Sequence, residues 1–281
     1  MAQSGIQMNL EDSIGDIVRK ARISTQVSLE EAAGLAGVGV EAYQQFESSG
    51  RAPAGLRWAE LCGRLTLEAG RLERQHDGWR PGAVDLAGWC ELRVFTTAGD
   101  DMTVNAYLVW DEVTREAAVF DTGFDASPIL ACIEAEGLTL RHLFITHSHG
   151  DHIAALGPIR ERHPKVRLHS GSKNAPVEHR VRPNDFINLG SLRITNRDTP
   201  GHAEDGITYV IGNWPEDAPH VAVVGDAIFA GSIGGARENL ELARQKIREQ
   251  IFSLPAGTLI CPGHGPLTTV GAERAHNPWF Q

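Results

Sequence analysis

The chain has 281 residues, 42% of them hydrophobic, and a formal net charge of −10 at pH 7. It can bury at least one sizeable core and suits two domains, while no window offers the roughly 20 uncharged apolar residues that span a bilayer, and its start lacks the layout of a signal peptide. These absences favour a soluble, cytoplasmic protein with no membrane attachment. Because the acidic balance disfavours attraction to nucleic acid or anionic lipid, we expect the protein to act on a small molecule.

Residues 1–80 predict a small all-α domain. Apolar residues recur at helical spacing between Ser13 and Glu73, and Ser28 with Glu31 has the pattern of a capping box at the start of one helix. A turn-rich stretch then ends the helical pattern, and we place a linker at 81–88.

Residues 89–281 predict an α/β domain. Short β-rich runs alternate with helical stretches over a length within the usual range for one domain. The expected strands are Leu92–Thr97, Val104–Trp110 and Ala117–Phe120. The expected helices are Ser127–Glu136 and Leu240–Phe252.

Part of the helical region resembles the helix-turn-helix of phage-repressor-type (XRE-like) regulators. The matching positions are Ser28, Glu31, Ala33, Gly37, Val38, Phe46, Glu47 and Pro53. The resemblance implies that Gln44 and Gln45 would contact DNA. However, residues 1–80 hold 9 Lys and Arg against 11 Asp and Glu, whereas DNA-binding domains normally carry a basic surface. We therefore disfavour nucleic acid as a partner and expect this helix-turn-helix-like domain to serve homodimer formation or to act as a lid over the second domain.

The densest chemistry in the sequence lies at residues 146–152, which read Thr-His-Ser-His-Gly-Asp-His. In an extended segment His147 and His149 point to the same side, and the glycine lets the chain turn into a helix that carries Asp151 and His152. Burying so many polar groups without a partner would be costly. Imidazole and carboxylate together suit zinc, iron or manganese, so the segment predicts a metal site.

Three further segments place a metal-ligating residue type beside a glycine. They supply His202, Asp226 and His264, the last two directly after apolar runs. Open α/β sheets put their sites at strand ends of this kind. These additional candidates favour a catalytic site over a purely structural one.

Together these segments resemble the metallo-β-lactamase-fold hydrolases, whose HxHxDH motif matches residues 147–152. The match covers 89–281 and supplies seven ligand positions in family order. It implies an αββα sandwich with two divalent metal ions, for which we expect zinc first and iron or manganese as alternatives. The implied ligands are His147, His149 and His202 for one ion, Asp151, His152 and His264 for the other, and Asp226 as the bridge. Asp121 matches a position that supports the site without binding metal.

Within this family, residues 226–235 and 261–280 resemble the glyoxalase II (hydroxyacylglutathione hydrolase)-like branch. The resemblance implies hydrolysis of a small thioester or ester by a hydroxide shared between the ions, without a serine or cysteine nucleophile. Asp151 and Asp226 would be the catalytic carboxylates, and Asp226 would pass a proton to the leaving group. Gly235 stands where the branch commonly has arginine, so the role of glutathione stays open.

Three alternatives remain from the sequence. Persulfide dioxygenases resemble glyoxalase II and use one iron, whose ligands would correspond to His147, His202 and Asp226. A lactonase would need the same hydroxide attack. In a third class of function, the metal domain would sense a ligand and residues 1–80 would regulate transcription. The metal content distinguishes the first alternative from the hydrolase.

Overall fold

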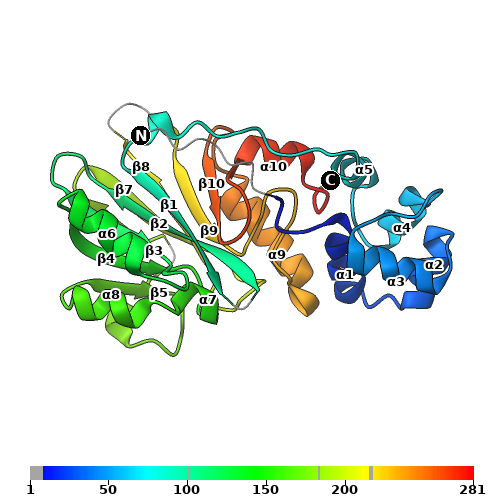
Figure 1. The fold of residues 1–281 in the computed structure, drawn as a ribbon, viewed down its shortest axis with the longest axis horizontal. Helices are drawn as coiled ribbons and strands as arrows, with labels where there is room; N and C mark the ends of the chain where they lie inside the picture. The colour runs from blue at the N-terminus through cyan, green and yellow to red at the C-terminus, as the bar shows by residue number, and fades with distance from the viewer. Residues whose placement is uncertain (1–8, 100, 183, 215–217) are drawn as a thin grey trace.

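The computed structural model describes residues 9–99, 101–182, 184–214 and 218–281. The first eight residues of the predicted helical domain therefore lie outside the described residues. Figure 1 shows a sandwich of two sheets with a group of helices to one side. Within the described ranges no helix has both the length and the apolar character needed to cross a membrane.

The N-terminal region is all-helical, as the apolar spacing predicts. Its helices are α1 (Ile14–Ser24), α2 (Leu29–Ala36), α3 (Val40–Ser49), α4 (Trp58–Arg64) and α5 (Ala69–His76). Helix α1 begins with a complete capping box, in which the Ser13 side chain accepts from the Asp16 amide and the Asp16 carboxylate accepts from the Ser13 amide. Its buried positions recur every three or four residues, so one face packs inward.

Of the two hydrogen bonds of the capping box predicted at Ser28 and Glu31, only one is present among the described residues. Ser28 Oγ accepts from the Glu31 amide at 3.1 Å. The Glu31 carboxylate instead accepts from Arg64 Nε at 2.8 Å, a partner 33 positions away. The local pattern identified the helix start correctly, but it could not reveal the competing long-range ion pair.

Two mixed sheets form the sandwich. The first has the strand order β1 (Leu92–Gly99), β2 (Met102–Trp110), β3 (Glu116–Phe120), β4 (Thr139–Ile145) and β5 (Arg167–Ser170). The second has the order β11 (Thr268–Thr269), β10 (Leu259–Pro262), β9 (Val221–Gly225), β8 (Ile207–Gly212), β7 (Leu192–Asp198) and β6 (Phe186–Leu189). Strands β3, β4 and β5 are parallel to one another, as are β9 and β10, and the remaining pairs are antiparallel.

Alternation along the strands divides the apolar residues into layers. On β2, Tyr107 and Val109 face the second sheet, whereas Leu108 and Trp110 pack under the helices outside the first sheet. The covering helices are α6 (Ser127–Ala135) and α8 (Leu156–Arg162) on one side, and α9 (Leu240–Lys246), the π-helix η4 (Ile247–Ile251) and α10 (Val270–His276) on the other. The predicted αββα sandwich is confirmed. The short helical segments are η1 (Leu86–Gly88), α7 (Gly150–Ile153), η2 (Val177–His179) and η3 (Arg237–Asn239).

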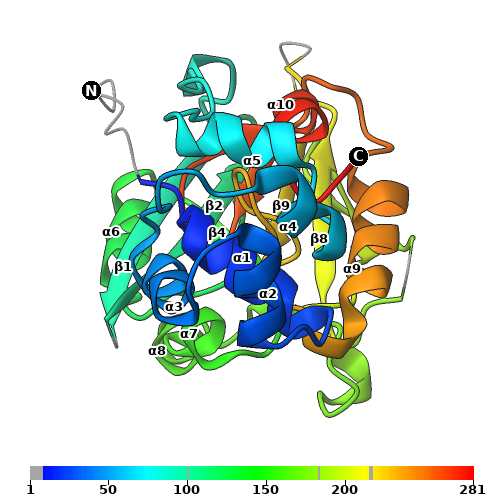
Figure 2. The ribbon, with the colours of Figure 1, turned by 90° about the vertical axis from the view of Figure 1, so that its right-hand side faces the viewer.

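The N-terminal helices share their core with the outer side of the second sheet. Leu61 and Leu72 belong to the same apolar cluster as Ile251 and Phe280. Polar contacts join the two parts as well: the Glu68 amide donates to a carbonyl in the C-terminal tail at 2.8 Å. Figure 1 shows α9 and α10 between the second sheet and these helices, and Figure 2, viewed from the side of the helices, shows α10 next to α5 and α9 at the edge of the group. The predicted limits 1–80, 81–88 and 89–281 stay a prediction, since this core crosses them.

Candidate metal centre

Five strands end where the predicted site residues begin. Asp121 follows β3, the segment 146–152 follows β4, His202 lies four residues after β7, Asp226 follows β9, and His264 lies two residues after β10. The carboxyl ends of these strands therefore bring together residues that are far apart in sequence.

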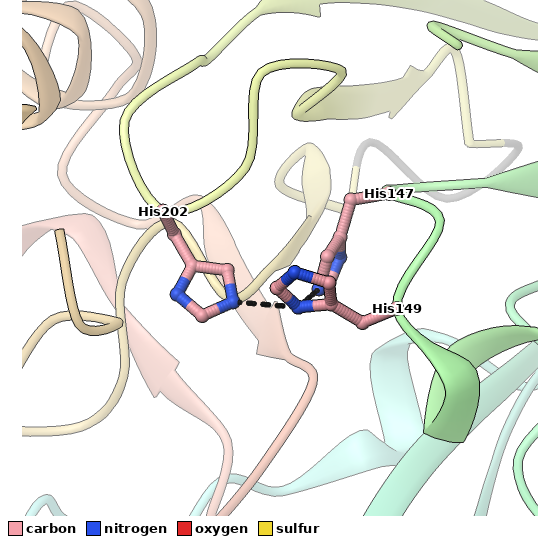
Figure 3. Close-up of side chains that lie close together, drawn as sticks. All are labelled: His147, His149 and His202. Atoms are coloured by element: carbon pink, nitrogen blue, oxygen red, sulfur yellow. Dashed lines mark hydrogen bonds between the residues drawn. The ribbon is translucent and has the colours of Figure 1, made fainter. Parts of the chain in front are cut away.

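The segment after β4 has the predicted local geometry. His149 has extended backbone angles (φ −68°, ψ 150°), and α7 begins at the following glycine. His147 and His149 turn toward each other, with 3.0 Å between Nε2 of the first and Nδ1 of the second. Figure 3 shows that the His202 ring, carried by a different loop, joins them, and its Nε2 lies 3.0 Å from His149 Nδ1.

The seven predicted ligand residues form two groups of three with Asp226 between them. Within each group the candidate ligand atoms lie within 4.8 Å of one another. The groups are His147, His149 and His202 on one side and Asp151, His152 and His264 on the other. Asp226 Oδ2 lies 3.5 Å from His202 Nε2 and 3.4 Å from His264 Nε2, so this carboxylate reaches both groups.

Four of the five imidazoles are oriented by a hydrogen bond at Nδ1, which leaves Nε2 directed at the centre. The Thr146 hydroxyl donates to Asp121, so it accepts from His147. The other three rings donate to a carboxylate or a backbone carbonyl. These pairs are His152 with Asp121, His202 with the Gly235 carbonyl, and His264 with the Thr103 carbonyl.

Two atoms at the centre fit a bound cation. His152 Nε2 and Asp226 Oδ1 are buried 3.3 Å apart, and neither makes a hydrogen bond to another described residue. Unpaired polar atoms are expensive to bury, and a divalent cation between imidazole nitrogens and carboxylate oxygens would satisfy both. The mixture of nitrogen and oxygen donors suits zinc, iron or manganese.

The charges at the centre are strongly coupled. Burial, with repulsion from His152, lowers the pKa of His147 to about 2, so this ring is neutral and can donate a lone pair. Burial disfavours the charged form of His152, but the carboxylates of Asp121 and Asp226 raise its pKa to about 10. Burial alone would raise the pKa of Asp226, yet the neighbouring rings of His152 and His264 hold it well below its usual range.

Asp121 lies behind His152, on the side of the ring away from Asp226. Its carboxylate accepts from the Thr146 amide and hydroxyl, both at 2.7 Å, and pairs with His152 Nδ1. Its backbone has a left-handed φ of 56°, an unfavourable conformation for a residue with a side chain. This placement fits the supporting role that the sequence predicts.

Several residues at the site escaped the sequence interpretation. Thr146 and Gly263 lie beside predicted ligands, and a Cβ on Gly263 would collide with Asp226 Oδ1 and lie 2.6 Å from His152 Cε1. The sequence marks that glycine only as a neighbour of His264, and its closeness to Asp226 and His152 had no signal. The Thr103 and Gly235 carbonyls had no signal, because any residue carries one. Gln44 and Gln45 are exposed on α3 and belong to neither group, so their contact with DNA stays a prediction.

Several proteins of known name resemble part of this chain. The chain is 32% identical over 201 residues to the probable metallo-hydrolase YqgX of Bacillus subtilis, covering 63% of this chain and 92% of that protein. It is 29% identical over 163 residues to a hydroxyacylglutathione hydrolase of Fuscovulum blasticum, covering 57% of this chain and 61% of that one. It is 30% identical over 181 residues to the human mitochondrial persulfide dioxygenase ETHE1, covering 61% and 69%. The chain thus spans less than two thirds of the hydroxyacylglutathione hydrolase.

Solved structures and a family model resemble this chain as well. The BLEG-1 B3 metallo-beta-lactamase superposes with a TM-score of 0.57 at 28% identity, covering 68% of this chain and 99% of that one. ETHE1 from Myxococcus xanthus gives 0.57 at 30% identity, covering 66% and 83%. The model of the "Metallo-beta-lactamase superfamily" matches residues 99–264. This protein therefore belongs to the metallo-β-lactamase superfamily.

Proposed function

We propose that this protein is a hydrolase with two metal ions that cleaves a small thioester or ester. The observation that carries the proposal is the pair of three-residue groups joined by Asp226. A single-ion centre would need only one of these groups. The similarity to a hydroxyacylglutathione hydrolase supports a thioester as the first substrate to test.

His147, His149 and His202 would hold one ion, and Asp151, His152 and His264 the other. Two divalent cations in such a site lower the pKa of a water molecule between them and polarise a substrate carbonyl. We expect zinc and keep iron and manganese as alternatives, since all three accept this donor set.

The two carboxylates have separate tasks in this proposal. Asp226, buried between the groups, would fix their separation and pass a proton to the leaving group. Asp151 Oδ2 lies 3.1 Å from His264 Nε2, so these two atoms are close enough to bind the second ion together. Because the seven predicted ligands, Asp226 among them, suffice for this chemistry, no serine or cysteine nucleophile is needed.

A persulfide dioxygenase is the second candidate. The 30% identity to the human enzyme favours it, as do His147 Nε2 and His202 Nε2, which lie 4.0 and 3.5 Å from Asp226 Oδ2. Two histidines and one carboxylate with open positions suit non-haem iron in oxygenases.

Metal analysis of the purified protein, followed by a substrate screen, separates the two. We expect about two metal equivalents per chain and thiol release from an acyl thioester, followed with a thiol-reactive dye. Lactones and a chromogenic β-lactam belong in the same screen, because ring opening needs the same attack on a carbonyl. One iron per chain, with oxygen consumed on glutathione persulfide and no hydrolysis, would overturn the proposal in favour of the dioxygenase.

A further inference from the structure

The N-terminal helical region contacts both sides of the metal centre. The backbone of Glu11 packs against Gly265, so closely that a Cβ on that glycine would lie 3.1 Å from the Glu11 nitrogen, and Gly265 directly follows His264. On the other side, α1 packs against η3, and Lys20 on α1 donates to the Ile233 carbonyl in the loop that precedes η3. We call residues 229–236, which lie between Asp226 and η3, the support loop.

A buried polar junction joins α1 to the support loop. Asp12 is only 7% exposed, and its Oδ2 accepts from Lys20 Nζ and from Ser232 Oγ, each at 2.6 Å. Lys20 Nζ also donates to the Ile233 carbonyl at 3.2 Å and lies 5.3 Å from the centre of the Phe229 ring. Because the Asp12 carboxylate and its two donors are largely removed from water, breaking this junction would leave charged groups without partners.

The support loop in turn orients His202. The Gly235 carbonyl, two residues beyond Ile233, accepts from His202 Nδ1 at 3.1 Å and directs Nε2 of that ring at the centre. Gly234 packs closely against both Asp226 and His202. A Cβ at this position would collide with the Asp226 carbonyl and lie 2.8 Å from His202 Nδ1. A shift of the loop at Ile233 would therefore move the hydrogen bond that holds the His202 ring.

We propose that Asp12 and Lys20 of the helical region are positioning residues for the metal-binding imidazole of His202. The N-terminal helical region would then help to keep a metal ligand in the orientation that binds the ion. This inference rests on the metal site of the proposed function, but not on the identity of its substrate.

Charge and positioning predict opposite effects for loss of Lys20. Its ammonium group places a positive charge near the His202 ring and would repel a cation bound there. If charge alone mattered, removing it would tighten metal binding. If Lys20 positions the support loop, removing it will weaken binding at the group that contains His202.

The test compares Lys20→Met, Lys20→Arg and Arg19→Met in the full chain. Metal affinity is measured by titration with Zn²⁺ against a chromophoric chelator, and the coordination geometry by the visible spectrum of the Co²⁺-loaded protein. Arg19 is the matched control, since it lies on the same helix, half exposed, in an ion pair with Asp16. We expect Lys20→Met to bind one of the two ions about tenfold more weakly, which is typical when the support of a metal ligand is lost, and to change the Co²⁺ spectrum. Lys20→Arg, which keeps a donor for both partners, should restore both readouts, and Arg19→Met should match the wild type.

A Lys20→Met protein that binds both ions as tightly as the wild type, or more tightly, would overturn the positioning role. A wild-type protein that binds no divalent ion would instead overturn the proposed function. If Lys20→Met does not fold, Asp12→Ala takes its place, because it removes the same anchor and should give the same selective weakening. An unchanged affinity in Asp12→Ala would equally refute the inference.

Discussion

Asp121 Oδ2 lies 2.8 Å from His152 Nδ1, and both side chains are buried. The same carboxylate accepts hydrogen bonds from the amide and the hydroxyl of Thr146, the residue before the first histidine of the motif. One side chain at the end of β3 thus fixes the ring of His152 and the start of the segment that carries His147. The orientation of the ligands depends on a residue that does not face the centre.

Asp121→Asn should therefore impair metal binding without removing a ligand. With the amide oxygen on the Thr146 amide, the amide nitrogen would face His152 Nδ1 as a second donor, which disfavours the tautomer that leaves Nε2 free. We expect affinity for one ion to fall about 10- to 100-fold, measured by chelator competition. Asp125→Asn is the control and should leave the affinity unchanged, because Asp125 is exposed just before α6 and accepts from the Ser127 amide. Equal affinity in both variants would refute this role for Asp121.

Gly263→Ala should disable the centre through its shape alone. The added methyl group would collide with Asp226 Oδ1 and press on the His152 ring, both of which are held by neighbours that cannot give way easily. We expect loss of metal from at least one group, measured as metal content per folded chain. Gly157→Ala is the matched change, since nothing lies within 4 Å of a Cβ at that helical position. Retention of both ions in Gly263→Ala would contradict the packing described.

A second histidine pair, away from the centre, should make stability depend on pH. His142 Nδ1 and His169 Nε2 lie 2.9 Å apart on the neighbouring strands β4 and β5, and His169 stacks on Phe144. Burial lowers the pKa of His142, and burial with repulsion between the two rings lowers the pKa of His169 to about 3. The charged and titratable side chains that act on the pair are Arg167, Arg141, Glu116 and His179.

In the unfolded chain, His142 and His169 bind protons once the pH falls below the ordinary histidine pKa of about 6.5, whereas in the folded chain they stay neutral to lower pH. The stability is therefore complete above that pH and declines as the pH falls from about 6.5 toward 3. We expect the wild type to lose more free energy of unfolding between pH 7 and pH 5 than His169→Phe, measured in urea. An equal loss in both proteins would show that the pair does not titrate in this way.

Two ion pairs in the helical region should differ in their contribution to stability. Arg22 makes two hydrogen bonds to the buried Glu47, at 2.6 and 2.9 Å, whereas Arg64 meets Glu31 where both side chains are more than two fifths exposed. Arg22→Met leaves a buried carboxylate without its partner and should lower the free energy of unfolding by about 3 kcal/mol. Arg64→Met should lower it by at most about 1 kcal/mol. Similar values from chemical denaturation would contradict the difference in burial.

Much of the centre could be predicted because its ligands stand at the ends of strands. The seven predicted ligands converge, and the turn at Gly150 occurs where the sequence places it. The helical stretch predicted over Leu240–Phe252 is an α-helix only to Lys246 and continues as a π-helix to Ile251, since apolar spacing does not distinguish the two hydrogen-bond patterns.

The sequence could not reveal the contacts between side chains and backbone atoms that lie far apart along the chain. The Lys20 ammonium meets a carbonyl 213 residues away, and the His264 ring meets a carbonyl 161 residues away. A carbonyl is present at every residue, so no side-chain pattern marks these partners. The sequence-based expectation of a lid or dimer interface likewise did not anticipate how closely Glu11 and Lys20 approach the loops beside the ligands.

We expect five imidazoles and two carboxylates to enclose two cations. Anomalous X-ray diffraction from a crystal grown with Zn²⁺, recorded at the zinc edge, measures this directly. We predict two peaks per chain, one beside His147, His149 and His202 and one beside Asp151, His152 and His264, with Asp226 between them. A single peak, or peaks remote from these side chains, would contradict the account.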